Sequence, residues 1–212
     1  MKTIKRISLT GFTLIEMLVV TTITVVLLVV GADLFGGILR SSNCPTQLNE
    51  INQNGKFTLD LIERKIRGAT EVWAYQGGTY VAASDPGFMS PWSCGASCRF
   101  AVTNSEGTQF TKFEFILESG VVNGKIVMAE GNDLGTIDST NQDLTNINTR
   151  SGVSLVDDRT GEPQSPRVTI NYTPGKPPIV GVSFVLASGV SSDRSNCDVR
   201  GPFNTSIELR SY

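Results

Sequence analysis

Four cysteines are the side chains of this sequence best suited to covalent chemistry, and two of them are close together. Cys94 and Cys98 lie four residues apart in "CGASC", whereas Cys44 and Cys197 are far apart. Outside the cytoplasm a local Cys94–Cys98 disulfide is the simplest interpretation, and it would leave Cys44 to pair with Cys197. Other pairings stay open, since four cysteines allow three connectivities. Redox catalysis favours the tighter Cys-x-x-Cys spacing, and a cysteine zinc site needs a second close pair.

Histidine is absent from all 212 residues, which removes His-based catalytic triads and imidazole metal sites. The sequence has no nucleophile elbow, no Ser-x-x-Lys pair and no phosphate-cradling glycine motif. We therefore expect no enzyme, no catalytic residue and no cofactor.

The acidic residues of the C-terminal half gather in polar stretches. Residues 130–152 and the "VDDRTGEPQSP" that follows are expected to be surface loop. Calcium binding is the alternative, although EF-hand spacing is missing, and turn formation and solubility are the favoured roles. The aspartates concerned are Asp133, Asp138, Asp143, Asp157 and Asp158.

One acid, Glu16, lies at the start of the most apolar part of the chain. Residues 17–32 contain no charge, and a carboxylate facing lipid costs on the order of 2.5–3.5 kcal/mol. Glu16 is therefore either solvated by lipid headgroups or paired with a positive group.

The elements that position Glu16 begin with an apolar helix. A helix over residues 12–39 would be about 42 Å long, against about 30 Å of membrane hydrocarbon. The basic "MKTIKR" precedes it and only Arg40 follows, so the N-terminus should stay cytoplasmic. No Ala-x-Ala-type cleavage site follows the run, which disfavours an ordinary removed signal peptide. A buried helix of a soluble domain is the remaining alternative, disfavoured by length.

The charge balance argues against nucleic acid as a partner. The chain has 18 basic and 20 acidic residues, and three of the basic ones precede residue 11. Phosphate binding favours a basic excess, and the remainder of the chain is acidic.

The N-terminal residues resemble a type IV prepilin. "KRISLTG" followed by "FTLIEMLVV" has a basic leader ending in Gly, then Phe, then Glu four residues later, then an apolar helix. The resemblance covers about the first 30 residues. It implies that a prepilin peptidase cleaves between Gly11 and Phe12 and methylates the new Phe12 amine. Glu16 would then pair with the amine of its own chain or of a neighbouring subunit and so set filament register.

The resemblance also implies partners and a location. The partners would be major and minor pilin subunits, the prepilin peptidase, an inner-membrane assembly platform, and membrane lipid before assembly. The chain would be a single-pass inner-membrane protein with an extracytoplasmic head, and later part of an extracellular filament. "NGKFTLDLIERKIRGA" resembles minor pilins and pseudopilins of the W/J type, which favours a minor pilin acting in pilus assembly, adhesion or motility.

Other functions remain open. A pseudopilin of a type II secretion system and a major pilin are close alternatives. A membrane-anchored extracytoplasmic binding protein with a β-rich ectodomain belongs to a different class, and an extracellular enzyme ranks third.

The second helix is expected to be amphipathic. Pro45 should kink the helix or restart it, and Gly68 should end it after the basic "ERKIR". The glycines Gly31, Gly36 and Gly37 would permit either local loosening or close helix packing. The expected apolar stripe consists of Leu48, Ile51, Leu59, Ile62 and Ile66.

Strands and turns follow the helix, which predicts an α+β protein with a mainly antiparallel sheet. The resemblance implies a type IV pilin fold. Its expected parts are a cleaved leader (1–11), a membrane or filament-core helix (12–39), an amphipathic helix (40–69) and a β-rich head (70–212). The expected strands are 79–83, 99–103, 112–118, 121–128 with a hairpin turn at Asn123-Gly124, 167–172, 179–186 and 203–210.

Overall fold

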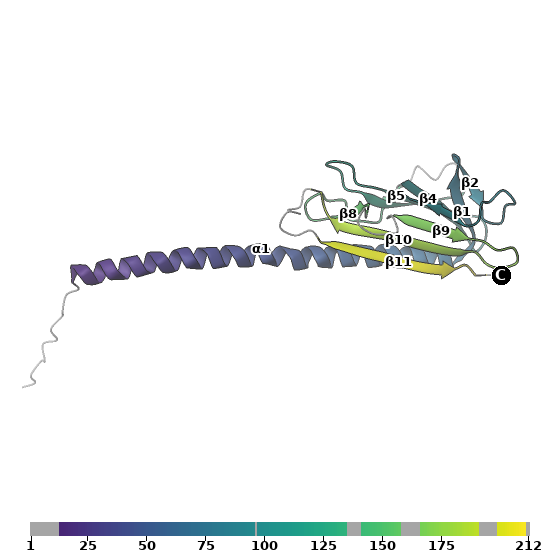
Figure 1. The fold of residues 1–212 in the computed structure, drawn as a ribbon. Helices are drawn as coiled ribbons and strands as arrows, with labels where there is room; N and C mark the ends of the chain where they lie inside the picture. Colours follow the sequence, from purple (N-terminus) through teal and green to yellow (C-terminus); the bar gives the residue numbers. More distant parts are fainter. Residues whose placement is uncertain (1–12, 96, 135–140, 158–165, 191–198, 211–212) are drawn as a thin grey trace, which may run out of the picture. The chain divides into compact units, whose positions relative to one another are not determined.

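The structure, a computed structural model, describes residues 13–95, 97–134, 141–157, 166–190 and 199–210 (Figure 1). The chain divides into two units, an N-terminal unit of Met1–Asn43 and a head of Cys44–Tyr212. The described residues form a long apolar helix near the N-terminus and a mostly antiparallel β region. The α+β class is therefore as expected.

The helix α1 spans Leu14–Arg67. It contains Pro45, so the expected restart at that residue is wrong: helical structure continues through the proline. Proline removes one backbone N–H from the hydrogen-bond pattern, a loss that the flanking turns tolerate here. At the other end, the amide of Gly68 bonds to the carbonyl of Arg64 and closes the last turn.

Two antiparallel sheets make up the β part of the head. Sheet A has the order β2-β1-β4-β5-β6-β7, and sheet B has the order β11-β10-β9-β3, with β8 also pairing with β10. The strands of sheet A are β1 (Ala69–Gln76), β2 (Thr79–Ala82), β4 (Ser97–Asn104), β5 (Phe110–Ile116), β6 (Lys125–Gly131) and β7 (Gln142–Asp143). Those of sheet B are β3 (Trp92–Cys94), β8 (Val153–Val156), β9 (Arg167–Asn171), β10 (Ile179–Ser188) and β11 (Arg200–Glu208).

One apolar core joins the two sheets and the helical part of the head. Stacked and tilted rings of Phe100, Phe113, Phe115 and Phe184 bring sheets A and B together. Ile62 and Ile66 of α1 belong to the same cluster. Figure 1 shows β10 and β11 alongside the last turns of α1, and Phe203 of β11 lies against Gly55.

The buried face of α1 differs in part from the predicted stripe. Ile51, Ile62 and Ile66 are buried as expected, but Leu48 is 44% exposed. Gly55, Thr58 and Leu61 are also buried, and the Thr58 hydroxyl donates to the carbonyl of Leu144 at 3.4 Å. A stripe counted from apolar residues alone misses a small residue and a hydrogen-bonded threonine.

The predicted hairpin turn at Asn123-Gly124 is wrong. The chain reverses at Ser119–Val122, whose backbone groups bond to each other at 3.1 Å, and Gly120 has φ 58°. Asn123 is instead buried; its amide nitrogen donates to the carbonyls of Ile147 (3.2 Å) and Asn148 (3.0 Å). Gly120, three residues before Asn123, supplies the positive φ that the reversal requires.

The stretch 130–152 is not all surface loop, contrary to expectation. Leu144 and Thr145 are buried, and Gln142–Asp143 pairs with β6 as strand β7. The strands β1, β3 and β8 were not expected from the sequence either. All four residues of β8 are buried, so its sequence lacks the alternation that identifies a half-exposed strand.

Candidate functional site

The N-terminal motif is described only from Thr13 onward. Gly11 and Phe12, the predicted cleavage and methylation residues, lie outside the described residues. Thr13 caps α1: the amides of Glu16 and Met17 bond to its carbonyl at 3.1 and 3.2 Å, and its hydroxyl lies 3.4 Å from the amide of Glu16. Thr-x-x-Glu is the sequence of a capping box, in which Glu or Gln at the fourth position supports the helix start.

Glu16 therefore has a local role that the sequence reading did not identify. It is exposed in the first turn of α1, where the partial positive charge of the helix dipole favours an acid. This role and charge pairing with an amine are compatible, since both place a carboxylate at the helix N-terminus. The two roles differ in what they require of Glu16, because only pairing with an amine requires the negative charge of its side chain.

The helix that follows is long and apolar enough to cross a membrane. This segment is Leu14–Gly37, 24 residues, and its side chains are not covered by the rest of the structure. Its threonine hydroxyls are satisfied within the helix, as lipid requires. Thr21 donates to the carbonyl of Leu18 at 3.0 Å, Thr22 to that of Val19 at 2.8 Å, and Thr24 to that of Val20 at 2.7 Å.

The three glycines near the end of this segment face open space. A Cβ atom added to Gly31, Gly36 or Gly37 would meet nothing within 4 Å. Packing among the described residues therefore does not require glycine at these positions. The two expectations for them, local loosening and close approach to another helix, both stay open.

The basic residues at the end of α1 are largely engaged in ion pairs. Lys65 pairs with Glu130 of β6, and Arg67 pairs with Glu63 one turn earlier. This arrangement agrees with the expectation that "ERKIR" terminates the helix rather than forming a binding patch.

Cys94 and Cys98 form the local disulfide that their spacing favours, and Cys98 is fully buried. Cys44 is also disulfide-bonded. Cys197 lies outside the described residues, so the pairing of Cys44 with Cys197 stays a prediction.

The candidate calcium ligands are placed only in part. Asp143 forms an ion pair with Lys125 at 2.9 Å, while Asp138 and Asp158 lie outside the described residues. Among the residues that the structure does describe, no group of three or more His, Cys, Asp or Glu side chains could hold a metal ion.

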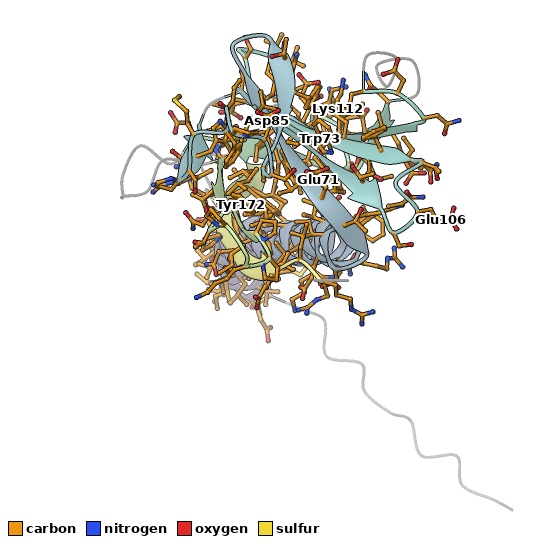
Figure 2. The ribbon with its side chains drawn as sticks, turned by 90° about the vertical axis from the view of Figure 1, so that its right-hand side faces the viewer. Glu71, Trp73, Asp85, Glu106, Lys112 and Tyr172 are labelled. Carbon is orange, nitrogen blue, oxygen red and sulfur yellow. A yellow bond between two sulfur atoms is a disulfide. The ribbon has the colours of Figure 1, made fainter. Side chains whose placement is uncertain are left out.

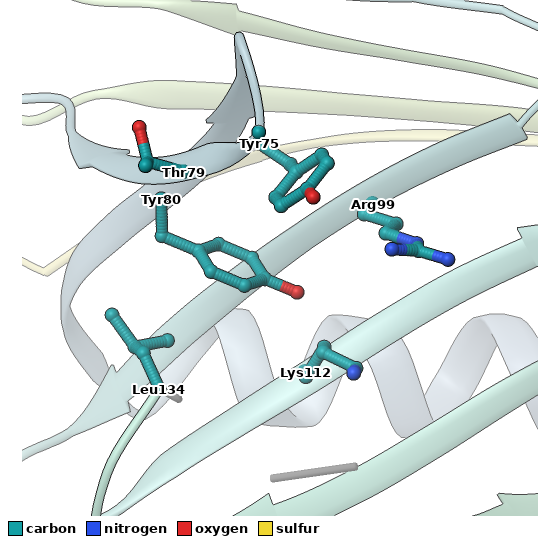
Figure 3. A pocket seen from close by; sticks show the side chains of 7 residues that line it. Tyr75, Thr79, Tyr80, Arg99, Lys112 and Leu134 are labelled. Atoms are coloured by element: carbon teal, nitrogen blue, oxygen red, sulfur yellow. The ribbon is translucent and has the colours of Figure 1, made fainter. Parts of the chain in front are cut away.

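A surface pocket of about 370 Å³ lies on sheet A, and it was not predicted from the sequence (Figure 3). Tyr75 and Tyr80, paired across β1 and β2, meet edge to face with ring centroids 5.1 Å apart. The guanidinium of Arg99 lies 5.3 Å from the centre of the Tyr75 ring. The lining residues are Tyr75, Gly78, Thr79, Tyr80, Arg99, Lys112 and Leu134.

Burial dominates the electrostatics of this pocket. It raises the pKa of Tyr80 well above the ordinary value, although the nearby Arg99 charge opposes the rise. Burial also lowers the pKa of Lys112, with the charge of Arg99 adding to the effect and Glu114 opposing it. For Arg99 burial acts downward, but the hydrogen bond and charge of Glu114 prevail and raise the pKa.

Lys112 is buried although it is the polar member of an alternating strand. Lys112 and Glu114 alternate with Phe113 and Phe115 along β5, yet Lys112 is only 3% exposed. β5 lies between β4 and β6, and Tyr80 and Leu134 join Lys112 in the pocket wall. A lysine in an alternating strand indicates the side of the sheet that faces away from the core, but it does not indicate which other segments cover that side.

Comparisons of this chain with protein-family models, with curated proteins and with solved structures find no match.

Proposed function

We propose that this chain is a subunit of a type IV pilus-type filament, most like a minor pilin. The observation that carries the proposal is the order of elements at the N-terminus: a basic leader, Gly11 and Phe12 come just before the 24-residue apolar segment, and Glu16 lies in the first turn of that segment. Cleavage before this segment leaves the anchor on the mature chain. Before assembly the anchor lies in the membrane, and in the filament its apolar side chains pack against those of other subunits.

Cleavage would also create the charge that Glu16 needs. Only Thr13 separates Phe12 from the first residue of α1, so a new ammonium on Phe12 would lie next to the positive end of the helix dipole. Glu16, in the first helical turn, offsets that repulsion within one chain or supplies a partner for the ammonium of a neighbour. An unpaired charge in the apolar filament core would be costly, so the pair favours one register between neighbours.

The head supports the proposal through its own architecture. The second half of α1 contributes a buried face to a core shared with antiparallel sheets, which leaves the sheets' outer surfaces to form the outside of a filament. A pseudopilin of a secretion system or a major pilin would use the same N-terminal parts. A membrane-anchored binding protein would need neither cleavage nor Glu16.

The test compares two substitutions of Glu16 in cells that assemble the filament. Glu16→Gln keeps the capping-box pattern but removes the charge, whereas Glu16→Ala removes both. Both variants should reach the membrane normally and drop at least about tenfold in sheared filaments, because leaving a buried charge unpaired costs about 3–5 kcal/mol.

Asp33→Asn is the matched control, since Asp33 is the other acid of the apolar segment and should tolerate the change. Normal incorporation of both Glu16 variants would contradict the proposed pairing. Loss of filament incorporation in Glu16→Ala but not in Glu16→Gln would show that Glu16 acts by capping the helix instead.

A further inference from the structure

Three exposed apolar side chains lie together at one end of the head. Val121 and Val122 are in the chain reversal at Ser119–Val122 and are 81% and 62% exposed. Ile147 is 48% exposed, and its carbonyl accepts from the side chain of Asn123, the residue that follows Val122. Apolar side chains exposed singly are normal, whereas a group of them on a turn is a candidate interaction surface. We call Val121, Val122 and Ile147 the apolar tip.

The apolar tip lies at the end of the head where α1 enters it. The side chain of Asn54 accepts from the amide of Asn146 at 2.9 Å, whereas Lys65, later in α1, pairs with Glu130 near the end of β6. β6 therefore runs in the same direction as the helical part of the head. The turn that precedes Lys125, the first residue of β6, lies near the start of that helical part. Figure 1 shows β8, which bonds to the same loop, at this end of the head.

A positive charge accompanies the apolar tip. The amide of Arg150 bonds to the side chain of Asn148 at 2.9 Å, and the carbonyl of Asn148 accepts from Asn123. The Arg150 side chain is exposed and has no ion-pair partner in the part of the chain that the structure describes. Glu118, the acid that precedes the turn, accepts from the Ser154 hydroxyl at 2.8 Å. Apolar side chains beside a cation suit the boundary between lipid chains and anionic headgroups.

The length of chain keeps the apolar tip within reach of a membrane. The segment able to cross a membrane ends at Gly37, and Asn54 is 17 positions later, about 25 Å along a helix. Membrane helices tilt by up to about 40°, and a bend at Gly36 or Gly37 would meet no steric obstacle, since an added Cβ there has no neighbour within 4 Å. A head tethered so closely needs only a weak contact to stay at the lipid surface.

We propose that the apolar tip and Arg150 bind the surface of the membrane that the anchor spans. Val121, Val122 and Ile147 insert between the lipid headgroups, and Arg150 pairs with an anionic headgroup. The proposal rests on the membrane anchor of the proposed function but not on filament assembly. A second subunit is a poorer occupant, because a stable protein interface buries about 800 Å² on each partner and needs more than three apolar side chains.

The test uses the full-length protein in nanodiscs of phosphatidylcholine and phosphatidylglycerol, made with and without bromine on the acyl chains. Bromine quenches tryptophan fluorescence on contact, so Val121→Trp reports whether the apolar tip lies in the bilayer. The fluorescence that the new tryptophan adds to that of the unmodified protein should fall at least about twofold in brominated nanodiscs, since interfacial side chains lie about 5–10 Å into the lipid boundary.

Met89→Trp is the matched control, because Met89 is 72% exposed and the preference of tryptophan for membrane interfaces acts equally there. Met89 precedes Ser90, whose hydroxyl bonds to the backbone of Tyr172. Tyr172 follows β9, which pairs with the end of β10 that β8 does not reach. Figure 2 is drawn from this opposite end of the head and labels Tyr172. The fluorescence added by Met89→Trp should not be quenched.

The role of Arg150 is tested in the Val121→Trp protein. Arg150→Gln should lower the ratio of bound to free heads about fivefold in nanodiscs that contain phosphatidylglycerol, the effect of one cation near an anionic surface. It should change little in phosphatidylcholine alone. Lys176→Gln, at an exposed position of the opposite end, should leave the quenching unchanged in both lipids. Both replaced side chains are exposed, so the fold should be kept.

Unquenched fluorescence of Val121→Trp, or equal quenching of Val121→Trp and Met89→Trp, would overturn the membrane contact. Equal effects of Arg150→Gln and Lys176→Gln would overturn the role of Arg150. Loss of the protein from the nanodisc fraction would overturn the anchor and this proposal together. Failure of Glu16 variants to affect filament assembly would count against the filament alone, since contact with lipid needs neither cleavage nor other subunits.

Discussion

Tyr80 combines two properties that a single substitution can separate. Its ring is part of the aromatic pair with Tyr75, while its hydroxyl is buried without a partner among the described residues. Removing only the hydroxyl preserves the ring contact, so Phe at this position should not lower the stability of the head at neutral pH.

The first prediction concerns the alkaline limb of stability. The pKa of folded Tyr80 is raised above the ordinary value of 10.0, so above pH 10 the unfolded chain loses this proton while the folded chain keeps it. The folded state then binds more protons, and the free energy of unfolding falls as pH rises. Burial is the largest cause of the raised pKa; the charge of Arg99 opposes it, and Glu114 and Tyr75 add to it.

Tyr80→Phe should therefore lose less stability than the unmodified protein between pH 9 and about pH 11.5. Urea unfolding followed by tryptophan fluorescence measures the difference, since both tryptophans, Trp73 and Trp92, lie in strands of the head. Tyr172→Phe serves as the control. If the free energies of unfolding of Tyr80→Phe and the unmodified protein changed in parallel with pH, burial would not raise the pKa of Tyr80.

Asn123 gives a second prediction. Its side chain donates to the carbonyls of Ile147 and Asn148 and accepts from the amide of Val190 at 2.8 Å, which ties three loop segments together. Asn123→Ala would leave these backbone groups unpaired in a buried place and should lower the free energy of unfolding by about 1–3 kcal/mol. Asn204→Ala, at an exposed position of β11, should have little effect; equal losses in both variants would contradict the account.

Residue types alone predict part of the candidate sites. Gly11, Phe12 and Glu16 were predicted because charge, glycine and an apolar run form a pattern in sequence, and their roles stay predictions. Asn123 was wrongly predicted as a turn residue because the partners of its side chain come from segments distant in the chain. For the same reason the Tyr75–Tyr80–Arg99 pocket left no signal: its residues lie on three strands that only the sheet brings together.

At the scale of elements, α1 illustrates what periodicity can and cannot show. Three of the five predicted stripe residues are buried, because a 3.6-residue period does mark a helix face. Gly55 is on that face for a steric reason. A Cβ atom there would lie 2.1 Å from the Phe203 ring, a distance no real contact allows.

The prediction for α1 therefore concerns the substitution Gly55→Ala. Overpacking should lower the free energy of unfolding of the head by about 1–3 kcal/mol, although alanine favours helix over glycine by roughly 0.5–1 kcal/mol. Gln53→Ala, at an exposed position of the same helix, should be neutral or stabilising. Chemical unfolding measures both.

The double variant Gly55→Ala/Phe203→Leu should be less destabilised than the sum of its parts, because leucine leaves room for the new methyl group. A Gly55→Ala protein as stable as the unmodified one would show that helix and β11 pack less closely than the structure has them.

Some strands could be predicted from the sequence and others could not. β5, β9, β10 and β11 were predicted within a few residues, since their sequences alternate or carry β-branched runs. β8 is buried on both faces, and β3 and β7 are only three and two residues long. Short or fully buried strands are specified by their neighbours and not by a local pattern.

At the scale of the whole molecule, one apolar segment and one β-rich head account for most of the sequence. The segment Leu14–Gly37 exposes its apolar side chains, and its polar hydroxyls bond to its own backbone. Such a surface is stable only in lipid or against other apolar helices. The proposed filament subunit would use both environments in turn, and proteolytic cleavage before Phe12 would be the step that allows the change.

The most direct test of the proposed filament function is the mass of the N-terminal peptide in protein purified from cells that naturally make it. We expect a chain that begins at Phe12 with a methylated amine and has lost residues 1–11. A chain that begins at Met1 and retains the whole leader would contradict it.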